Sequence, residues 1–468
     1  IGDWSSDVCS SDLENYYFYL IQTNEKFSSI QLKKIKDLIN NNPNERTLIN
    51  YEMSNILTQP QAITIIGPKM YMRSVFDTNF TNILNRLSIK QVTRCERYKI
   101  IPKHNVNLEQ YDMMVYQIYE KLPTQFDNYS ISSISKHPEI FFVDDISIYN
   151  KEQNLGFDEQ DIDNYNKYYK NIVKRKPTNI ELFDLSQSNS EHSRHWFFKG
   201  NLYKNKIKIL NSLFSMIKKT NNSNTNSLVA FSDNSSVIKG FKVFKSLNLN
   251  GYITIKEDLY DLVFTAETHN FPTLIYPFEG AATGIGGRIR DNHATGRGAY
   301  LTAGTAGYMV GELNTKKIGD YPEPKKILIE ASNGASDYGN KIGEPIINGF
   351  TRAFGMNLGG DRIEYIKPIL FTGGVGYINH NHIYKKMPKF GMLVVRIGGP
   401  VYKIGMGGGF ASSIEQGGEF KKFEKSSVQR GDPQYENKLN RIITYLCDMN
   451  EKNPIISIHD QGADRKST

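Results

Sequence analysis

The stretch that most constrains the fold is residues 267–297, which read ETHNFPTLIYPFEGAATGIGGRIRDNHATGR. The preceding Leu262–Ala266 is mostly apolar and partly β-branched, which predicts a short strand. Glu267, His269 and Asn270 would then emerge at the end of that strand, where sheet proteins commonly place ligands. This order indicates an α/β or α+β fold whose functional side chains gather at a strand end. A length of 468 residues leaves room for about three domains, so we expect a multidomain chain.

The segment Gly280–Gly287 (GAATGIGG) consists almost wholly of small residues, which predicts a loop. Successive backbone N–H groups of such a loop can close on a phosphate. The arginines that follow add guanidinium groups, and Asp291 together with Glu267 supplies two carboxylates for Mg²⁺. The candidate nucleotide- and phosphate-binding residues are Gly280, Ala281, Ala282, Thr283, Gly284, Ile285, Gly286, Gly287, Arg288, Ile289, Arg290 and Asp291.

Most glycine-rich loops are only tight turns, and turns without ligands are the plain alternative for this segment. It also matches neither the phosphate loop ending in G-K-[ST] nor the dinucleotide-binding fingerprint. The functional interpretation therefore depends on the Glu, His, Arg and Asp residues that bracket the glycines.

A second signal is Ser188–Phe198, which reads SNSEHSRHWFF. Glu191 and His195 are spaced i,i+4, and His192 and His195 are spaced i,i+3, so one helical turn can bring an acid and imidazoles together. Zinc would require an H-E-x-x-H arrangement or a third nearby ligand, so the pattern argues poorly for a metal. A structural role on a helix face is the alternative interpretation.

Two later segments combine predicted strands with small or acidic residues. Gly398–Ser413 follows the strand-like Met392–Ile397, and its small residues suit either an anion or close backbone packing. Ser427–Pro433 (SVQRGDP) precedes Ile458–Ala463 (IHDQGA), where a predicted strand ends on Asp460. The carboxylate of Asp460 is a further candidate Mg²⁺ ligand.

Composition narrows the class of protein. No stretch approaches the roughly 18 apolar residues of a membrane-spanning helix, and the mean hydropathy is −0.48, so we expect a soluble chain without a membrane partner. The net charge of +8 suits an anionic small molecule but is spread too thinly to indicate nucleic acid. Cys9, Cys95 and Cys447 have no paired spacing, which excludes a disulfide framework and a zinc ribbon and favours the reducing cytoplasm.

The termini differ from the rest of the chain. Ile1–Leu13 (IGDWSSDVCSSDL) has neither a basic start nor an apolar run, so it is no targeting peptide and looks like a translated sequencing adapter. Asp464–Thr468 (DRKST) has the same look, so we expect both ends to be artefacts. The expected division is artefact 1–13, first domain 14–150, linker 151–200, an α/β domain 201–385, the start of a further domain 386–463, and artefact 464–468.

Together with Ala335–Pro345 (ASDYGNKIGEP), these segments resemble the large single-chain phosphoribosylformylglycinamidine synthases, the amidotransferases of purine biosynthesis. The resemblance runs from about Glu14 to Ala463. It implies a domain like the small accessory subunit of the split enzyme, a helical linker, and the first half of a duplicated aminoimidazole-ribonucleotide-synthetase-like ATPase. The family's second synthetase half and glutaminase domain do not occur in this sequence, so we expect a fragment that is inactive alone.

The resemblance implies a ligase that converts formylglycinamide ribonucleotide, ATP and glutamine to the amidine, ADP, phosphate and glutamate. An amide oxygen is a very poor leaving group, and its phosphorylation creates an iminophosphate that ammonia can attack. Mg²⁺ is the implied cofactor and ATP the co-substrate. The ammonia derived from glutamine must reach the site without meeting bulk water.

Carried onto this chain, the resemblance makes His192 and His269 catalytic candidates and Glu267, Asp291 and Asp460 candidate Mg²⁺ ligands. The implied substrate-binding positions are Thr268, His269, Asn270, Phe271, Arg290 and Gln429. The chain departs from the family pattern at Ser193, where relatives often have Cys, at Phe271, where many have a second His, and at Thr265, where small-subunit relatives have Lys.

Two other functions stay open at this point. The chain could be another ATP-dependent synthetase of the same superfamily, such as aminoimidazole ribonucleotide or selenophosphate synthetase, although the long N-terminal domain and residues 188–198 weigh against it. It could instead be a non-catalytic nucleotide- or substrate-binding remnant. Turnover of formylglycinamide ribonucleotide with ammonia separates the two enzymes.

Overall fold

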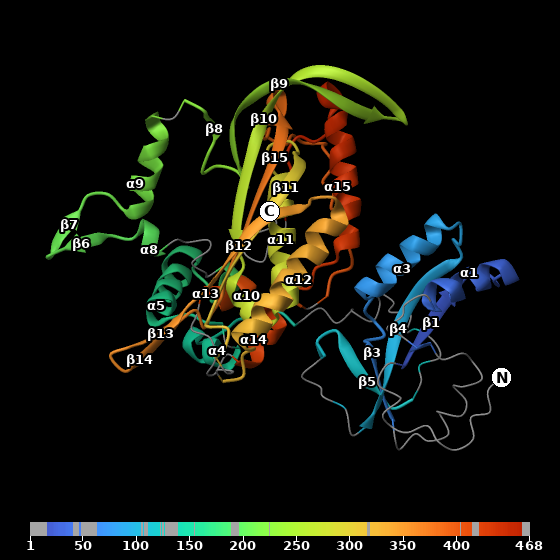
Figure 1. The fold of residues 1–468 in the computed structure, drawn as a ribbon. Coiled ribbons are helices and arrows are strands. Elements are labelled where there is room, and N and C mark those ends of the chain that lie inside the picture. The colour runs from blue at the N-terminus through green and yellow to red at the C-terminus, as the bar shows by residue number, and fades with distance from the viewer. Residues whose placement is uncertain are drawn as a thin grey trace. The chain divides into compact units, whose positions relative to one another are not determined.

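The computed structural model divides into two compact units, Ile1–Pro138 and Glu139–Thr468 (Figure 1). The sequence pattern, in contrast, predicts the first boundary near residue 150. The described residues are 16–40, 46–47, 63–103, 106, 111–121, 123, 126, 139–153, 155–188, 196–223, 225–315, 319–402, 404–413 and 421–460. Among these, no helix combines the length and apolarity needed to cross a membrane.

The first unit is built on a five-stranded sheet with the order β2-β1-β4-β3-β5. The pair β1 and β2 is parallel, and the other neighbouring pairs are antiparallel. Its elements are β1 (Tyr16–Thr23), α1 (Ser29–Asn40), β2 (Arg46–Thr47), β3 (Ile63–Pro68), α3 (Val75–Arg86), β4 (Val92–Pro102) and β5 (Tyr116–Tyr119).

Side chains alternate between the two faces along the strands of this sheet, and they contribute to two separate apolar clusters. Phe18 of β1 stacks on Tyr98 of β4 with ring centroids 4.7 Å apart. Cys95, three residues earlier in β4, instead packs with Leu84 of α3. A period of two sends such neighbours to opposite faces, so both faces of the sheet carry apolar clusters.

The second unit begins with a group of helices. They are α4 (Ile146–Gln153), α5 (Glu159–Tyr168), the π-helical turn η5 (Tyr169–Val173) and α6 (Asn179–Ser188). Asp158 and Asp161 form a capping box that starts α5, because each side chain accepts a hydrogen bond from the other residue's backbone N–H. Leu182 and Phe157 are buried at the centre of this group.

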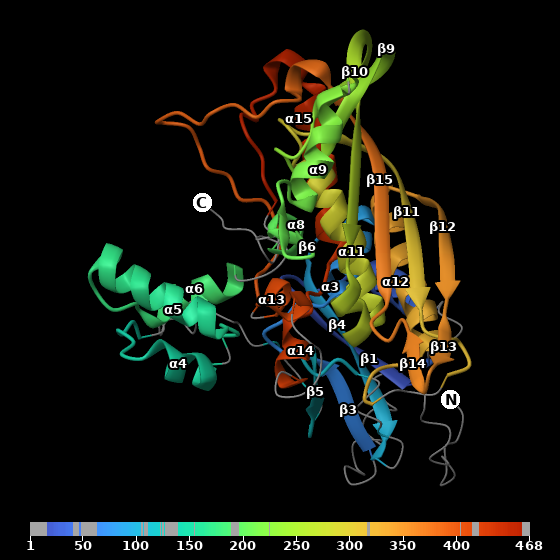
Figure 2. The same ribbon diagram turned by 90° about the vertical axis from the view of Figure 1, so that its left-hand side faces the viewer.

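A six-stranded sheet with the order β12-β11-β15-β10-β9-β8 forms the centre of the second unit. Figure 2 shows β10, β15, β11 and β12 side by side. Neighbouring strands are antiparallel except for the parallel pair β11 and β12. The strands are β8 (Ser227–Val229), β9 (Ser236–Leu249), β10 (Tyr252–Thr268), β11 (Tyr300–Val310), β12 (Ile346–Ala353) and β15 (Ile369–Asn379).

Helices α11 (Pro277–His293) and α12 (Pro324–Ile342) pack on this sheet. Ile285 and Ile289 of α11 meet Ala335 of α12 and Leu370 of β15 in a buried cluster. Strand β10 leads through the short helix α10 (Asn270–Ile275) directly into α11. This connection puts Glu267, His269 and Asn270 at a strand end, as the sequence predicts.

The remaining elements of the second unit are mostly short. They are α8 (Trp196–Lys199), β6 (Leu202–Lys204), β7 (Ile207–Ile209), α9 (Leu213–Thr220), η6 (Asn221–Ser223), β13 (Gly355–Leu358), β14 (Asp361–Glu364), η7 (His380–His382), α13 (Gly408–Ser413), α14 (Lys421–Ser427), α15 (Pro433–Asp448) and η9 (Asn450–Lys452).

Two strand predictions are wrong. Met392–Ile397 forms no strand, and Val394 within it is fully exposed. Residues 458–460 are likewise irregular, so Asp460 does not follow a strand. β-Branched residues favour strands only where a partner completes the hydrogen-bonded ladder, and no described strand pairs with either segment.

Candidate active site

The glycine-rich segment is a helix, not the predicted phosphate-binding loop. Gly280–Gly287 lies inside α11, where backbone N–H groups beyond the first turn bond to carbonyls four residues earlier. A Cβ atom at Gly280 would stand 2.4 Å from the backbone of Pro272, and one at Gly284 would stand 2.9 Å from Cβ of His269. The glycines therefore allow α11 to fold back tightly onto α10, which offsets their usual cost in a helix of about 1 kcal/mol each.

Several other residues of this stretch build the core. Ala281, Ala282, Ile285 and Ile289 are buried against the sheet and α12. A Cβ atom at Gly286 would stand 2.7 Å from a ring atom of Tyr338, so this glycine makes room for an aromatic ring of α12. The small residues thus serve close helix packing.

His269 lies between β10 and α10 and is half-buried. Its backbone N–H donates to the carbonyl of Leu370 at 3.0 Å, and its ring Nδ1 is 2.5 Å from the carbonyl oxygen of Gly280. A carbonyl oxygen only accepts, so Nδ1 carries a proton, and in a neutral ring Nε2 is then the acceptor. This arrangement suits a general base or a group that orients a substrate.

Arg288 is committed to a buried ion pair, contrary to the prediction that it binds phosphate. Its guanidinium forms two hydrogen bonds with the carboxylate of Glu344, one of them 2.7 Å from Nη1 to Oε1, and both side chains are 0% exposed. Gly304 and Gly374 lie against this guanidinium, because a Cβ atom would stand 2.8 and 1.9 Å from its nitrogens. The ion pair and its glycine cradle explain why this arginine is not available to a ligand.

The C-terminal end of α11 brings two predicted metal ligands together. Nδ2 of Asn234 donates to Oδ1 of Asp291 at 2.8 Å and to Oδ1 of Asp460 at 2.7 Å. Proteins commonly bind Mg²⁺ with one or two carboxylates, while water and phosphate oxygens complete the shell. The donor set therefore fits a hard divalent cation.

Arg290 lies beside these carboxylates in the last turn of α11. Burial by itself lowers the pKa of Arg290, but nearby acidic groups, chiefly Glu436 and also Asp460 and Asp291, raise this pKa overall. Its Nε has no hydrogen-bond partner among the described residues. A guanidinium that stays charged next to cation-binding carboxylates suits contact with an anionic substrate.

Glu267 does not join that pair. Its Oε1 accepts a hydrogen bond from the backbone N–H of Thr268 at 2.8 Å, and its carbonyl accepts one from Oγ1 of Thr372 at 3.3 Å. Within the described ranges, no three His, Cys, Asp or Glu side chains gather closely enough to hold a metal ion. The structure thus groups Asp291 with Asp460 but not with Glu267.

Two residues near His269 that were predicted to bind substrate, Asn270 and Phe271, instead make structural contacts. Phe271 is 1% exposed and packs against Ala411 and Val428, so its ring belongs to the core instead of lining a ligand site. Oδ1 of Asn270 accepts a hydrogen bond from the backbone N–H of Leu370 at 3.0 Å. These contacts fix the segment that carries His269.

Gln429 lies against the middle of α11, since its carbonyl accepts a hydrogen bond from Oγ1 of Thr283 at 3.3 Å.

The second sequence signal, Ser188–Phe198, falls largely outside the part of the chain that the structure describes. Glu191, His192 and His195 lie outside the described residues. His192 therefore stays a prediction from the resemblance.

Sequence reasoning missed Asn234, Lys367 and Lys385. Lys367 precedes β15, and its Nζ donates to the carbonyl of Ser412 at 3.1 Å. Burial lowers the pKa of Lys367. None of the three stands in a recognisable motif. Asn234 and Lys367 each lie two residues before a strand, and Lys385 lies after the short helix η7.

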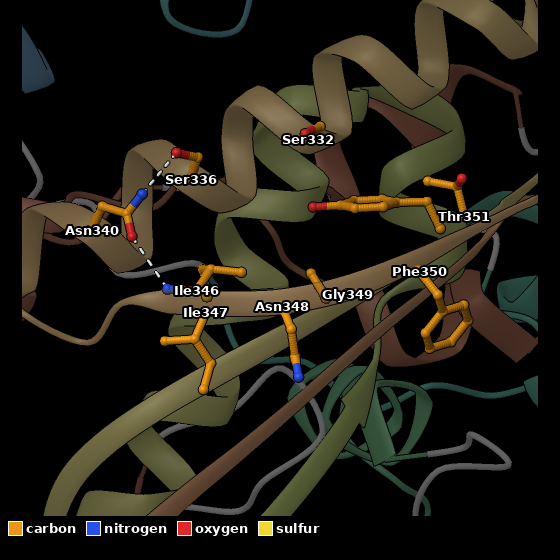
Figure 3. A pocket seen from close by; sticks show the side chains of 11 residues that line it. Ser332, Ser336, Asn340, Ile346, Ile347, Asn348, Gly349, Phe350 and Thr351 are labelled. Carbon is orange, nitrogen blue, oxygen red and sulfur yellow. Dashed lines mark hydrogen bonds between the residues drawn. The ribbon is translucent and has the colours of Figure 1, made fainter.

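A pocket of about 440 Å³ lies elsewhere in the second unit, between α12 and strands β11 and β12 (Figure 3). Asn340 closes one side, with Nδ2 donating to Oγ of Ser336 at 2.9 Å and Oδ1 accepting from the backbone N–H of Ile346 at 3.2 Å. Among the described residues, no charged side chain and no predicted site residue lines it. Because phosphate needs cationic or N–H partners, the groups around α11 are the better candidate site.

Two family models match parts of the chain. The formylglycinamide ribonucleotide amidotransferase linker domain matches residues 146–195, and the C-terminal domain of AIR synthase related proteins matches residues 389–464. Among solved structures, Thermotoga maritima PurL complexed with FGAR matches with a TM-score of 0.38 and 23% sequence identity. The match covers 61% of this chain and 37% of the PurL chain.

Curated relatives match most of the chain. A probable phosphoribosylformylglycinamidine synthase, chloroplastic/mitochondrial, of Arabidopsis thaliana is 44% identical over 436 residues, which are 86% of this chain and 31% of the relative. The phosphoribosylformylglycinamidine synthase of Dictyostelium discoideum is 44% identical over 87% of this chain and 32% of its own length. The human enzyme of that name is 41% identical over 85% of this chain and 32% of its own length. This chain, which spans about a third of these relatives, belongs to the phosphoribosylformylglycinamidine synthase family.

Proposed function

We propose that this chain supplies a substrate- and ATP-binding part of an enzyme that converts formylglycinamide ribonucleotide to its amidine in purine biosynthesis. The names of its relatives support this assignment, and T. maritima PurL has been solved with FGAR and with ATP. The nitrogen comes from glutamine by way of ammonia. Because the chain spans about a third of its relatives, the complete reaction is assigned to the whole protein.

The reaction must replace an amide oxygen, which is a very poor leaving group. Transfer of the γ-phosphoryl group of ATP to this oxygen releases ADP and forms an iminophosphate. Ammonia then attacks the same carbon, loses a proton, and phosphate leaves with the oxygen. The protein must hold the amide, disperse charge on the phosphoryl oxygens and accept the proton.

The observation that carries the proposal is the orientation of His269. Donation from its Nδ1 to the carbonyl of Gly280 makes Nε2 the acceptor, at the end of β10. We assign to Nε2 either the proton lost by ammonia or the orientation of the substrate amide. The backbone contact of Asn270 with Leu370 keeps the histidine in place.

We assign Asp291 and Asp460 to Mg²⁺, the cofactor that the family resemblance implies, because their oxygens face one amide nitrogen. A bound ion would neutralise negative charge on phosphate oxygens. Arg290, beside the same carboxylates, would contact phosphate oxygens of the bound nucleotide.

Calorimetric titration of the chain with formylglycinamide ribonucleotide and with ATP tests the proposal. In H269A we expect the affinity for the ribonucleotide to fall by about fivefold or more, since one hydrogen bond is worth about 1 kcal/mol or more, while ATP binding persists. The matched control is H380A, because His380 follows β15 at the end away from Leu370 and pairs with Asp261. Equal affinities in H269A and H380A would remove His269 from the site, and no binding of either ligand by the wild-type chain would contradict the function.

We also propose the cytoplasm as the compartment, the unit ending at Pro138 as the accessory-subunit-like domain, and the helices from α4 to α6 as the linker. Cys95 and Cys447 are free and buried, which suits a reducing compartment. The linker family model over residues 146–195 supports the linker assignment.

A further inference from the structure

Lys385, which no sequence motif singles out, has its ammonium group surrounded by acceptors. Its Nζ is 2.6 Å from Oδ1 of Asp233, 3.2 Å from Oδ1 of Asn234 and 3.3 Å from Nδ1 of His459. An ammonium group has three N–H donors and no acceptor, so these contacts can use all of them. The side chain of Lys385 is 17% exposed, which leaves little room for another orientation.

Asp233, the acidic partner of Lys385, is itself held in place. Oδ2 of Asp233 accepts a hydrogen bond from the backbone N–H of Gly296 at 3.0 Å, and the side chain of Asp233 is 6% exposed. Gly296 lies three residues beyond His293, the last residue of α11, so Lys385 is tied to the same end of the helix that carries Asp291. The lysine therefore has one defined place relative to the two carboxylates.

The contact of Lys385 with Asn234 determines which way the amide of Asn234 points. A lysine nitrogen can only donate, so the oxygen of the amide must face it. The amide nitrogen is then turned to the other side, where it donates to Asp291 and Asp460. With Lys385 in place, the amide cannot rotate to offer its oxygen to a cation.

The geometry points to Lys385 as a positioning residue for the cation site: it holds Asn234 so that the amide nitrogen occupies the place between Asp291 and Asp460 that a divalent cation takes. The amide nitrogen keeps two like-charged groups together without an ion. A cation must displace that nitrogen, so the affinity of the site is lower than its two carboxylates alone would give. This inference rests on the assignment of the two carboxylates to Mg²⁺.

Titration of the full chain with Mn²⁺, followed by the electron paramagnetic resonance signal of free Mn²⁺, tests this role without turnover. In K385M the amide can rotate and add an oxygen ligand, so we expect Mn²⁺ to bind about tenfold more tightly. The control is K386M, which removes the same charge from the neighbouring exposed residue and should change the affinity by less than about twofold. N234D replaces the amide nitrogen with a carboxylate oxygen and should tighten binding by at least as much as K385M.

Equal or weaker Mn²⁺ binding in K385M than in K386M overturns the role of Lys385. If circular dichroism shows that K385M does not fold, N234D decides alone, and unchanged or weaker binding in N234D overturns the proposal. D291N distinguishes a failure of the cation-site assignment from a failure of the positioning role of Lys385. If D291N leaves Mn²⁺ binding unchanged, the assigned cation site is wrong; if D291N weakens binding but K385M does not tighten it, only the positioning role fails.

Discussion

At its N-terminal end, helix α11 contacts residues that closely precede it in the chain, since the ring of His269 donates to Gly280 and its Cβ lies beside Gly284. At its C-terminal end, the contacts come from far along the chain, because Asn234 is 57 residues from Asp291 and 226 residues from Asp460. With a rise of 1.5 Å per residue, roughly 16 Å of helix separates Gly280 from Asp291. One helix therefore joins a locally built histidine position to a carboxylate site assembled from distant segments.

The two ends of α11, called here the histidine end and the carboxylate end, depend on different kinds of contact. Small residues hold the histidine end, because only glycine permits the backbones of α10 and α11 to approach so closely. Charged and amide side chains hold the other end, where Asn234 and Lys385 arrange two carboxylates. Packing changes should disturb the first end, and charge changes should disturb the second.

Breaking the ion pair of Arg288 with Glu344 should have the largest effect, because both side chains are fully buried. R288M leaves the carboxylate of Glu344 buried without its partner, so we expect the free energy of unfolding to fall by about 4 kcal/mol. Thermal or urea unfolding of the chain measures this loss. The double variant R288M/E344M should recover most of it, whereas a stable R288M that no longer binds ATP would mean that Arg288 contacts the nucleotide after all.

The histidine end is tested by adding one methyl group. In G280A the new Cβ would meet the backbone of Pro272, so we expect a loss of about 2–3 kcal/mol in the free energy of unfolding. The matched control is G287A in the same helix, where the nearest atom would be a side-chain nitrogen of Arg290 at 3.6 Å. G287A should be neutral or more stable by up to about 1 kcal/mol, and similar losses in both variants would argue against a specific close approach at Gly280.

The carboxylate end is tested by the coupling between its two acids. D291N and D460N should each weaken Mn²⁺ binding by about tenfold, or about 1.4 kcal/mol. If both oxygens serve one ion, the double variant should lose little more than either single variant, because the first change already removes the shared site. A hundredfold loss in the double variant would instead indicate two independent contributions. Mn²⁺ titration of the four proteins gives the coupling directly.

The sequence predicts the histidine end better than the carboxylate end. A short apolar run followed by Glu267, His269 and Asn270 locates the strand end, because strand and ligand-bearing residues are consecutive in the chain. Glycine content alone could not decide between a loop and a helix, since both use residues without side chains where the backbone comes close to something. Here the close neighbours are α10 and Tyr338, not a phosphate.

The order of residues along the chain is enough to identify the family motifs, the strand end that carries His269, and Asp291 and Asp460 as acidic candidates. Folding is needed to see that Arg288 pairs with Glu344, that Glu267 stands apart from the carboxylate pair, and that Asn234 and Lys385 complete the site. A strand end is set by neighbouring residues, whereas the partner of a charge depends on which distant segments the fold brings within hydrogen-bond distance.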